Sequence, residues 1–184
     1  MVPLGSLWLP ILVSSVVVFI ASSLVWMVLP HHRSDWKGLP DEDGVLAAMR
    51  KAGVGRGQYR FPLVDFRDKS PEMLKRFEIQ PMGVMTIWPP GRVNMGKQLG
   101  AWFVYLLFIS TCVAYLAGIV LPAGVPYRTV FRVTGTTAVL AYAAALIPNA
   151  IWWGRSWSTT LKEVADGVAY GLLTGVVFGW LWPR

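Results

Sequence analysis

Asp166 is the residue of this sequence most suited to chemistry, because it lies inside a long apolar run near the C-terminus. Acids placed inside a membrane are costly and often act as proton relays or ion ligands. Asn149 ends the preceding apolar run at a similar depth. The structural interpretation, which we favour, is that Asp166 helps the N-terminus of its own helix, pairs with Lys162 one turn back, or meets Asn149 across the helix pair.

Arg132 completes the candidate intramembrane polar site, which consists of Asp166, Asn149 and Arg132. It lies near the opposite end of its apolar run, so it cannot pair with Asp166. The loops and termini expected on that side of the membrane contain no Asp or Glu. We therefore expect Arg132 to extend towards lipid phosphate or the terminal carboxylate, with binding of an external ligand as the alternative.

His31, His32 and Asp35 form the one group whose residue types suggest a metal ion. Imidazole and carboxylate are common zinc ligands. On a continuous helix His31 and Asp35 would share a face, but adjacent histidines would not. The chain has no third histidine to complete a site. We therefore expect partly solvated histidines at the membrane interface, and we predict no metal ion and no other cofactor.

Enzymatic chemistry has little support in the sequence. The single cysteine, Cys112, lies in an apolar block without a histidine near its depth, which argues against a catalytic thiol. The motifs of nucleotide-binding loops, zinc proteases, serine hydrolases and CxxC redox sites are absent. The acids at 41–43 with His31 offer a distant enzymatic alternative, but no spacing selects a reaction. We expect a non-enzymatic protein.

Glycine recurs at every fourth position in the apolar run after Asp166, at Gly167, Gly171, Gly175 and Gly179. On a helix this spacing places all four on one face. Each interior glycine costs a soluble helix about 1 kcal/mol relative to alanine. In a bilayer, glycines allow a second helix backbone to approach closely. We predict a membrane helix whose glycine stripe, these four residues, serves helix packing.

The composition predicts a membrane protein, since 54% of the residues are hydrophobic and only 15% are charged. Apolar runs long enough to cross a bilayer occupy 1–30, 99–121, 126–153 and 160–182. A cleaved signal peptide is the alternative for the first run, although it lacks a positive n-region. Thr160 and Glu163 form a capping box that is expected to open the fourth span, and Pro148 is expected to kink the last turn of the third.

The predicted fold is an all-α membrane protein with four transmembrane helices and a small α+β cytoplasmic segment between the first two. We assign 1–30 to helix 1, 31–97 to the polar segment and 98–184 to helices 2–4. In the polar segment, one helix is expected to carry the acids at 41–43 in its first turn, and another is expected after Ser70. Strands are expected at 59–66 and 83–88.

The distribution of positive charge predicts the orientation in the membrane. Lys and Arg flank the spans on the side of the polar segment, whereas the opposite side has only Arg128, Arg132 and Arg184. The positive-inside rule places 31–97 in the cytoplasm and both termini outside the inner (plasma) membrane. The same rule, with anionic lipid, explains the net charge of +7 without nucleic acid as a partner.

A resemblance adds to this interpretation. The stretch LPHHRSDWKGLPDEDGVLAAMRKAGVGRGQYRFP, with SPEMLKRF and MGKQLGAWF further on, resembles a group of bacterial integral membrane proteins of similar length. The resemblance covers most of the chain. It implies a four-span protein of the bacterial inner membrane, and it implies no activity, cofactor or site residues.

Two functional hypotheses follow from these features. Small residues at four-residue spacing on three spans favour a non-enzymatic accessory or structural subunit of a membrane assembly, with another membrane protein or a second copy as partner. The alternative is a small proton- or ion-coupled transporter that uses Asp166. A single intramembrane acid and the lack of a clear inverted repeat weaken this alternative.

Overall fold

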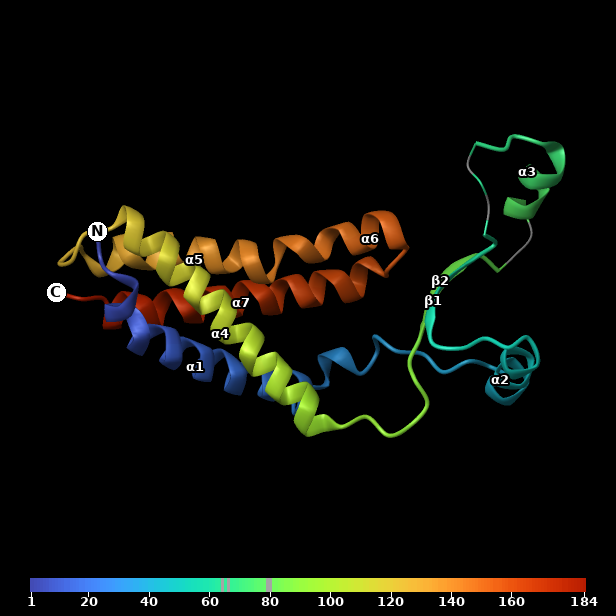
Figure 1. Cartoon of the computed structure of the whole chain (residues 1–184), viewed down its shortest axis with the longest axis horizontal. Coiled ribbons are helices and arrows are strands. Elements are labelled where there is room, and N and C mark those ends of the chain that lie inside the picture. Colours follow the sequence, from blue (N-terminus) through green and yellow to red (C-terminus); the bar gives the residue numbers. More distant parts are fainter. Residues whose placement is uncertain (64, 66, 79–80) are drawn as a thin grey trace. The chain divides into compact units, whose positions relative to one another are not determined.

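The structure is a computed structural model that describes residues 1–63, 65, 67–78 and 81–184 (Figure 1). The chain separates into two compact units, one formed by 1–36 with 94–184 and the other by 37–93. The helices of the first unit are α1 (Trp8–Met27), α4 (Met95–Val120), α5 (Tyr127–Tyr142), α6 (Ile147–Trp153) and α7 (Trp157–Leu181), with short 3-10 helices at Leu4–Leu7, Pro30–His32 and Ala144–Leu146.

Four helical stretches are long and apolar enough to cross a membrane, namely Leu4–Met27, Met95–Val120, Tyr127–Trp153 and Trp157–Leu181. The prediction of four spans is therefore confirmed by helix length and composition, and the protein has the features of a multi-pass membrane protein. The two termini lie at the same end of the bundle (Figure 1). There the amide of Val2 donates to the carbonyl of Gly118 at 2.9 Å, and that of Gly124 donates to Pro183 at 3.0 Å.

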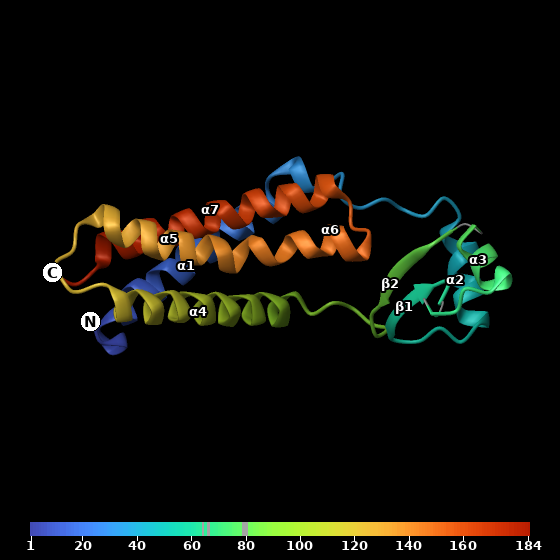
Figure 2. The same cartoon turned by 90° about the horizontal axis from the view of Figure 1, so that it is seen from above.

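The glycine stripe lies against α5, which runs beside α7 in both views (Figures 1 and 2). A Cβ placed on any of these four glycines would lie within 3 Å of an atom of α5. The nearest atoms would belong to Tyr142 at 2.9 Å for Gly167, Val139 at 2.5 Å for Gly171, Gly135 at 2.9 Å for Gly175 and Tyr127 at 2.6 Å for Gly179. The stripe is therefore an internal contact that brings two helix backbones together, and it is not free to receive another protein.

The third span is interrupted earlier than the sequence predicted. The α-helix ends at Tyr142, a 3-10 turn covers Ala144–Leu146, and α6 begins at Ile147. Pro148 explains the position of the break, because its nitrogen cannot donate to the carbonyl of Ala144 and its ring crowds that carbonyl. The kink was expected in the last turn, but a proline disturbs the turn that precedes it.

The fourth span begins one turn before the predicted capping box. Helix α7 starts at Trp157, and the amide of Thr160 donates to the carbonyl of Ser156 at 2.9 Å. Thr160 is fully buried inside this first turn, and Glu163 pairs with Arg155. The capping-box prediction was wrong, because the amide of Thr160 already has a partner within the helix.

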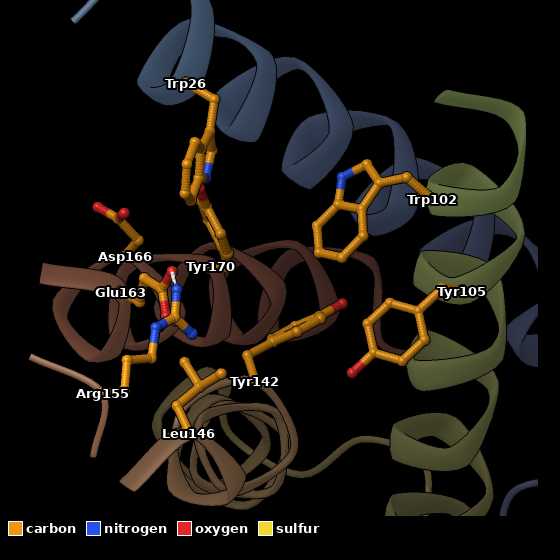
Figure 3. A pocket seen from close by; sticks show the side chains of 10 residues that line it. Trp26, Trp102, Tyr105, Tyr142, Leu146, Arg155, Glu163, Asp166 and Tyr170 are labelled. Carbon is orange, nitrogen blue, oxygen red and sulfur yellow. Dashed lines mark hydrogen bonds and ion pairs between the residues drawn. The ribbon is translucent and has the colours of Figure 1, made fainter. Parts of the chain in front are cut away.

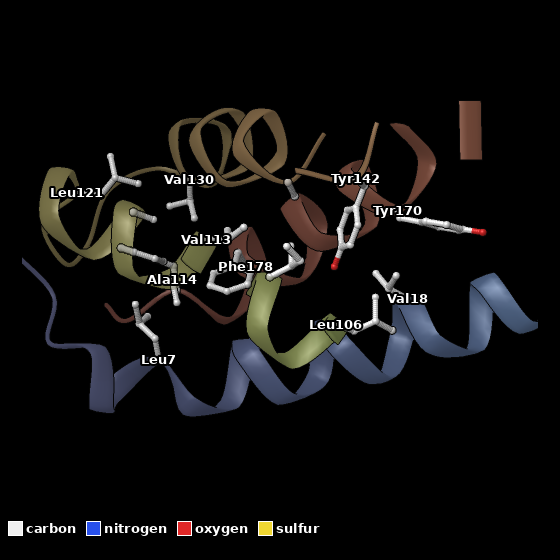
Figure 4. Close-up of a cluster of buried hydrophobic side chains, with 14 of the residues drawn as sticks. Leu7, Val18, Leu106, Val113, Ala114, Leu121, Val130, Tyr142, Tyr170 and Phe178 are labelled. Atoms are coloured by element: carbon white, nitrogen blue, oxygen red, sulfur yellow. The ribbon is translucent and has the colours of Figure 1, made fainter. Parts of the chain in front are cut away.

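The core of the membrane unit lies where α1, α4, α5 and α7 meet (Figure 4). Its fully buried side chains include Leu7, Val18, Leu106, Val130 and Phe178. Hydroxyl groups interrupt this apolar core. The hydroxyl oxygens of Ser14 and Ser15 in α1 each lie 3.1 Å from the hydroxyl of Ser110 in α4, within hydrogen-bond distance, which joins the two helices.

The unit at 37–93 contains α2 (Glu42–Lys51), α3 (Pro71–Glu78) and an antiparallel pair of strands, β1 (Gly57–Phe61) and β2 (Gly83–Ile87). The predicted N-cap at Ser70 is confirmed, since its hydroxyl accepts from the amide of Met73 at 3.2 Å. Asp41, which was expected in the first turn of its helix, is itself the N-cap and accepts from the amide of Gly44 at 3.0 Å. The first strand ends at Phe61, before the predicted end, and positions 64 and 66 of that prediction lie outside the described residues.

Candidate functional site

A group of charged side chains gathers where α1 ends beside the start of α7. The 3-10 turn at Pro30–His32 follows α1 and brings both histidines to Asp166 of α7. The ring of His32 stacks on Trp26, with centroids 4.0 Å apart and planes within 4°. We call His31, His32, Asp35, Lys162 and Asp166 the His–Asp cluster.

His32 is the central member of the His–Asp cluster. Its Nδ1 lies 2.6 Å from Oδ2 of Asp35, and its Nε2 lies 2.7 Å from Oδ2 of Asp166. His31 approaches the other oxygen of Asp166, with Nε2 3.4 Å from Oδ1. Asp166, which is 14% exposed, therefore faces both histidines of the chain.

Lys162 completes the cluster from the first turns of α7. Its ammonium group donates to Oδ1 of Asp35 at 2.7 Å, to the backbone carbonyl of His31 at 2.6 Å and to the hydroxyl of Ser34 at 3.0 Å. These bonds hold the segment after α1 against α7. Asp35 is the most enclosed carboxylate of the cluster, with a side chain 3% exposed.

The arrangement favours a protonated imidazole at His32, because both ring nitrogens face carboxylate oxygens and a protonated ring donates from both. Burial lowers the pKa of His32, but hydrogen bonds to Asp35 and Asp166, together with their charges, outweigh burial and raise the pKa above its usual value. Hydrogen bonds from Lys162 and His32 lower the pKa of Asp35.

A cavity of about 400 Å³ opens beside the His–Asp cluster (Figure 3). Its walls are mainly aromatic, and its charged residues lie towards one end (Figure 3). The lining consists of Trp26, Trp102, Tyr105, Tyr142, Leu146, Arg155, Glu163, Asp166, Gly167 and Tyr170. Asp166 is therefore shared between the cluster and the cavity.

Several polar groups of the cavity wall have room for a ligand. Arg155 donates to Oε1 of Glu163, whereas Oε2 of Glu163 is buried without a hydrogen bond among the described residues. The hydroxyls of Tyr142 and Tyr170 are also buried, and neither forms a hydrogen bond of normal geometry with a residue that the structure describes. Buried polar groups usually have partners, so water or a polar ligand is expected to occupy this cavity.

The structure gives Asp166 different neighbours from those that the sequence predicted. Lys162 contacts Asp35 instead of Asp166. The side chain of Asn149 makes no hydrogen bond to Asp166 in the described residues, and the backbone carbonyl of Asn149 accepts from Arg155 at 3.3 Å. Within the described chain Arg132 forms no ion pair. It is exposed on α5 beside a shallow depression lined by Thr129, Val133, Thr136 and Thr137.

The candidate metal ligands also change. His31, His32 and Asp35 do come together, but Asp166 replaces Asp35 as the carboxylate that faces both histidines. One donor atom from each of His31, His32 and Asp166 lies within 4.8 Å of the others. The expectation that adjacent histidines diverge assumed a continuous helix, whereas a 3-10 turn lets both side chains reach Asp166.

Comparisons of the chain with models of known protein families, with curated proteins and with solved structures find no match. The His–Asp cluster and the cavity beside it are therefore the features that indicate a function.

Proposed function

We propose that the protein is a small ion-coupled carrier in which Asp166 binds the coupled ion. The main support is that this intramembrane carboxylate faces two histidines and also lines a cavity with buried, unsatisfied polar groups. Ionisable residues inside membrane spans typically mark ion pathways. The glycine stripe, which first favoured an accessory subunit, is occupied by α5 and no longer supports that role.

Hydroxyl groups extend the polar surface from the cavity into the bundle. Tyr170 and Tyr142 meet edge to face, with ring centroids 6.2 Å apart, and both line the cavity. Deeper in the same unit, Ser14, Ser15 and Ser110 are fully buried and hydrogen-bonded to one another. Such groups offer successive oxygen ligands to an ion that leaves the cavity, which a purely apolar core would not.

We place the carrier in the bacterial inner membrane, with the segment 31–97 in the cytoplasm and both termini outside. The support for this orientation is the excess of Lys and Arg beside the spans at the end that carries the segment 31–97. In this orientation the His–Asp cluster and the cavity open towards the cytoplasmic side.

Reconstitution tests the proposal. The purified protein is placed in liposomes, a potassium gradient with valinomycin sets the membrane potential, and trapped dyes report protons and zinc. We expect the wild type to carry one of these ions faster than empty liposomes, and Asp166→Asn to remove that flux. Asp43→Asn, the same change at an exposed acid of α2, is the matched control. Equal flux through Asp166→Asn and the wild type would refute the carrier.

An accessory subunit remains the second candidate, supported by a different pair of glycines. Gly96 and Gly100 lie one turn apart at the start of α4, and a Cβ on Gly100 would meet nothing within 4 Å. This open small-residue pair could receive a helix of another membrane protein or of a second copy. Gly100→Ile should then remove a stoichiometric partner from the protein extracted in mild detergent, as measured by native mass spectrometry. An unchanged complex would exclude this surface.

A further inference from the structure

We propose that His31, His32 and Asp166 bind one divalent transition-metal ion, with zinc as the best-suited probe. The proposal deepens the carrier hypothesis by naming the class of its ion, and it rests on that hypothesis only for transport. Binding itself can be measured in the purified protein. The proposal depends on three observations, which are the convergence of the donor atoms, the support behind His32 and the exposure of His31.

The donor atoms converge on a region that one metal ion could occupy, since one atom from each of the three residues lies within 4.8 Å of the others. Zinc bonds of about 2.0–2.1 Å in a tetrahedral site place neighbouring ligand atoms about 3.3 Å apart. Nε2 of His31 lies 3.4 Å from Oδ1 of Asp166, and Nε2 of His32 lies 2.7 Å from Oδ2. The two distances involve different oxygens of Asp166, so a metal ion requires the carboxylate to rotate until one oxygen lies about 3.3 Å from both ring nitrogens.

Asp35 is placed as a supporting residue of a metal site. Metal-bound histidines usually donate their second ring nitrogen to a carboxylate, which fixes the tautomer and the ring orientation. Nδ1 of His32 lies 2.6 Å from Asp35, and Lys162 holds Asp35 from its other oxygen at 2.7 Å. Stacking on Trp26 fixes the plane of the ring. This support leaves Nε2 of His32 directed at Asp166, where the metal ion takes the place of the proton.

Access to the cluster favours an open metal site over a closed one. The side chain of His31 is 35% exposed, so water or a ligand can reach the ion as a fourth partner. Three protein ligands with one open position are typical of sites where zinc exchanges or reacts. Two imidazoles and one carboxylate suit zinc, nickel or copper, whereas magnesium prefers oxygen ligands alone. The site should therefore discriminate strongly against magnesium.

Calorimetry on the full chain in detergent tests the site, with zinc chloride as titrant. We expect one zinc ion per chain, no detectable magnesium binding, and loss of affinity of about 100-fold in Asp166→Asn. Asp35→Asn should weaken binding about 10- to 100-fold, because it removes only the support of His32. Asp43→Asn should change the affinity less than twofold. X-ray absorption of the zinc-loaded wild type should show two imidazole ligands.

Further measurements separate a loss of zinc binding from misfolding and from a loss of transport. If Asp166→Asn does not remain monodisperse, His31→Ala replaces it, since His31 is partly exposed and contacts Asp166 at only 3.4 Å. Zinc affinity that is unchanged in His31→Ala, or absorption spectra without imidazole, would overturn the metal site. If zinc does not bind but Asp166→Asn still abolishes proton flux, the metal site fails and the carrier stands. If zinc binds as expected and no ion crosses the liposome, the carrier fails and the site stands.

Discussion

Gly171→Ala should weaken the bundle although it adds a single methyl group. The new Cβ would lie 2.6 Å from the backbone nitrogen of Val139, about 0.8 Å closer than an ordinary contact. A backbone atom cannot rotate away, so α5 and α7 must separate along their shared length. Overpacking of this kind costs about 1–3 kcal/mol. The helix propensity of alanine offsets up to about 1 kcal/mol, which leaves a net loss of up to about 2 kcal/mol relative to the wild type. Relative to an alanine placed in open space on another helix, the loss stays at about 1–3 kcal/mol.

Titration with sodium dodecyl sulfate in mixed micelles measures this loss through the tryptophan fluorescence of the unfolding protein. Gly100→Ala is the matched control, because it makes the same change on α4 in open space. We expect the control to keep or slightly raise the free energy of unfolding. If Gly171→Ala is as stable as Gly100→Ala, α5 and α7 do not pack through the glycine stripe and the proposed core is incorrect.

Three further predictions concern the polar groups. Because the pKa of His32 is raised in the folded protein, His32 stabilises the fold below about pH 6.5, and this stabilisation is lost as the pH rises. Because the pKa of Asp35 is lowered, Asp35 stabilises the fold above about pH 3.8, and this stabilisation is lost as the pH falls. Without metal, the thermal midpoint should therefore be highest between these two pH values. A midpoint that rises from pH 6 to 8 would contradict this. Lys162→Met should lower the midpoint at pH 6 by removing the cation that pairs with Asp35, and an unchanged midpoint would show that the pair is unimportant. Ser110→Ala should cost about 0.6–1 kcal/mol in the same detergent titration, since it removes the hydroxyl that links Ser14 and Ser15 of α1 to α4. No loss would mean that their bonds to the carbonyl of Ile11 are sufficient.

The parts of the fold that local signals determine could be predicted from the sequence. Long apolar runs identify four spans, and Asp41 and Ser70 mark the starts of α2 and α3. The sequence predicted the helix ends in the third and fourth spans less accurately. Thr160 and Glu163 match a capping pattern, but burial and the pairing of Glu163 with Arg155 decide their positions, and both are tertiary effects.

The sequence singled out residues of the candidate site, but in two separate groups, and it did not predict that they meet. Asp166, His31 and His32 were each selected by residue type, yet 134 residues separate His32 from Asp166, and no local spacing connects them. The topology did place both at the same end of the bundle. The step that the sequence did not reveal is the 3-10 turn at Pro30, which brings the histidines to Asp166 of α7.

Zinc flux into liposomes that contain either the wild type or Asp166→Asn tests the central claim most directly. Both proteins are reconstituted at equal density, and Asp43→Asn serves as the control for a lost carboxylate elsewhere in the chain. We predict zinc entry that saturates with concentration in the wild type and in the control, and none above empty liposomes in Asp166→Asn. Equal zinc entry in all three proteins, or in none of them, would contradict the assignment of Asp166 as the ligand of a carried metal ion.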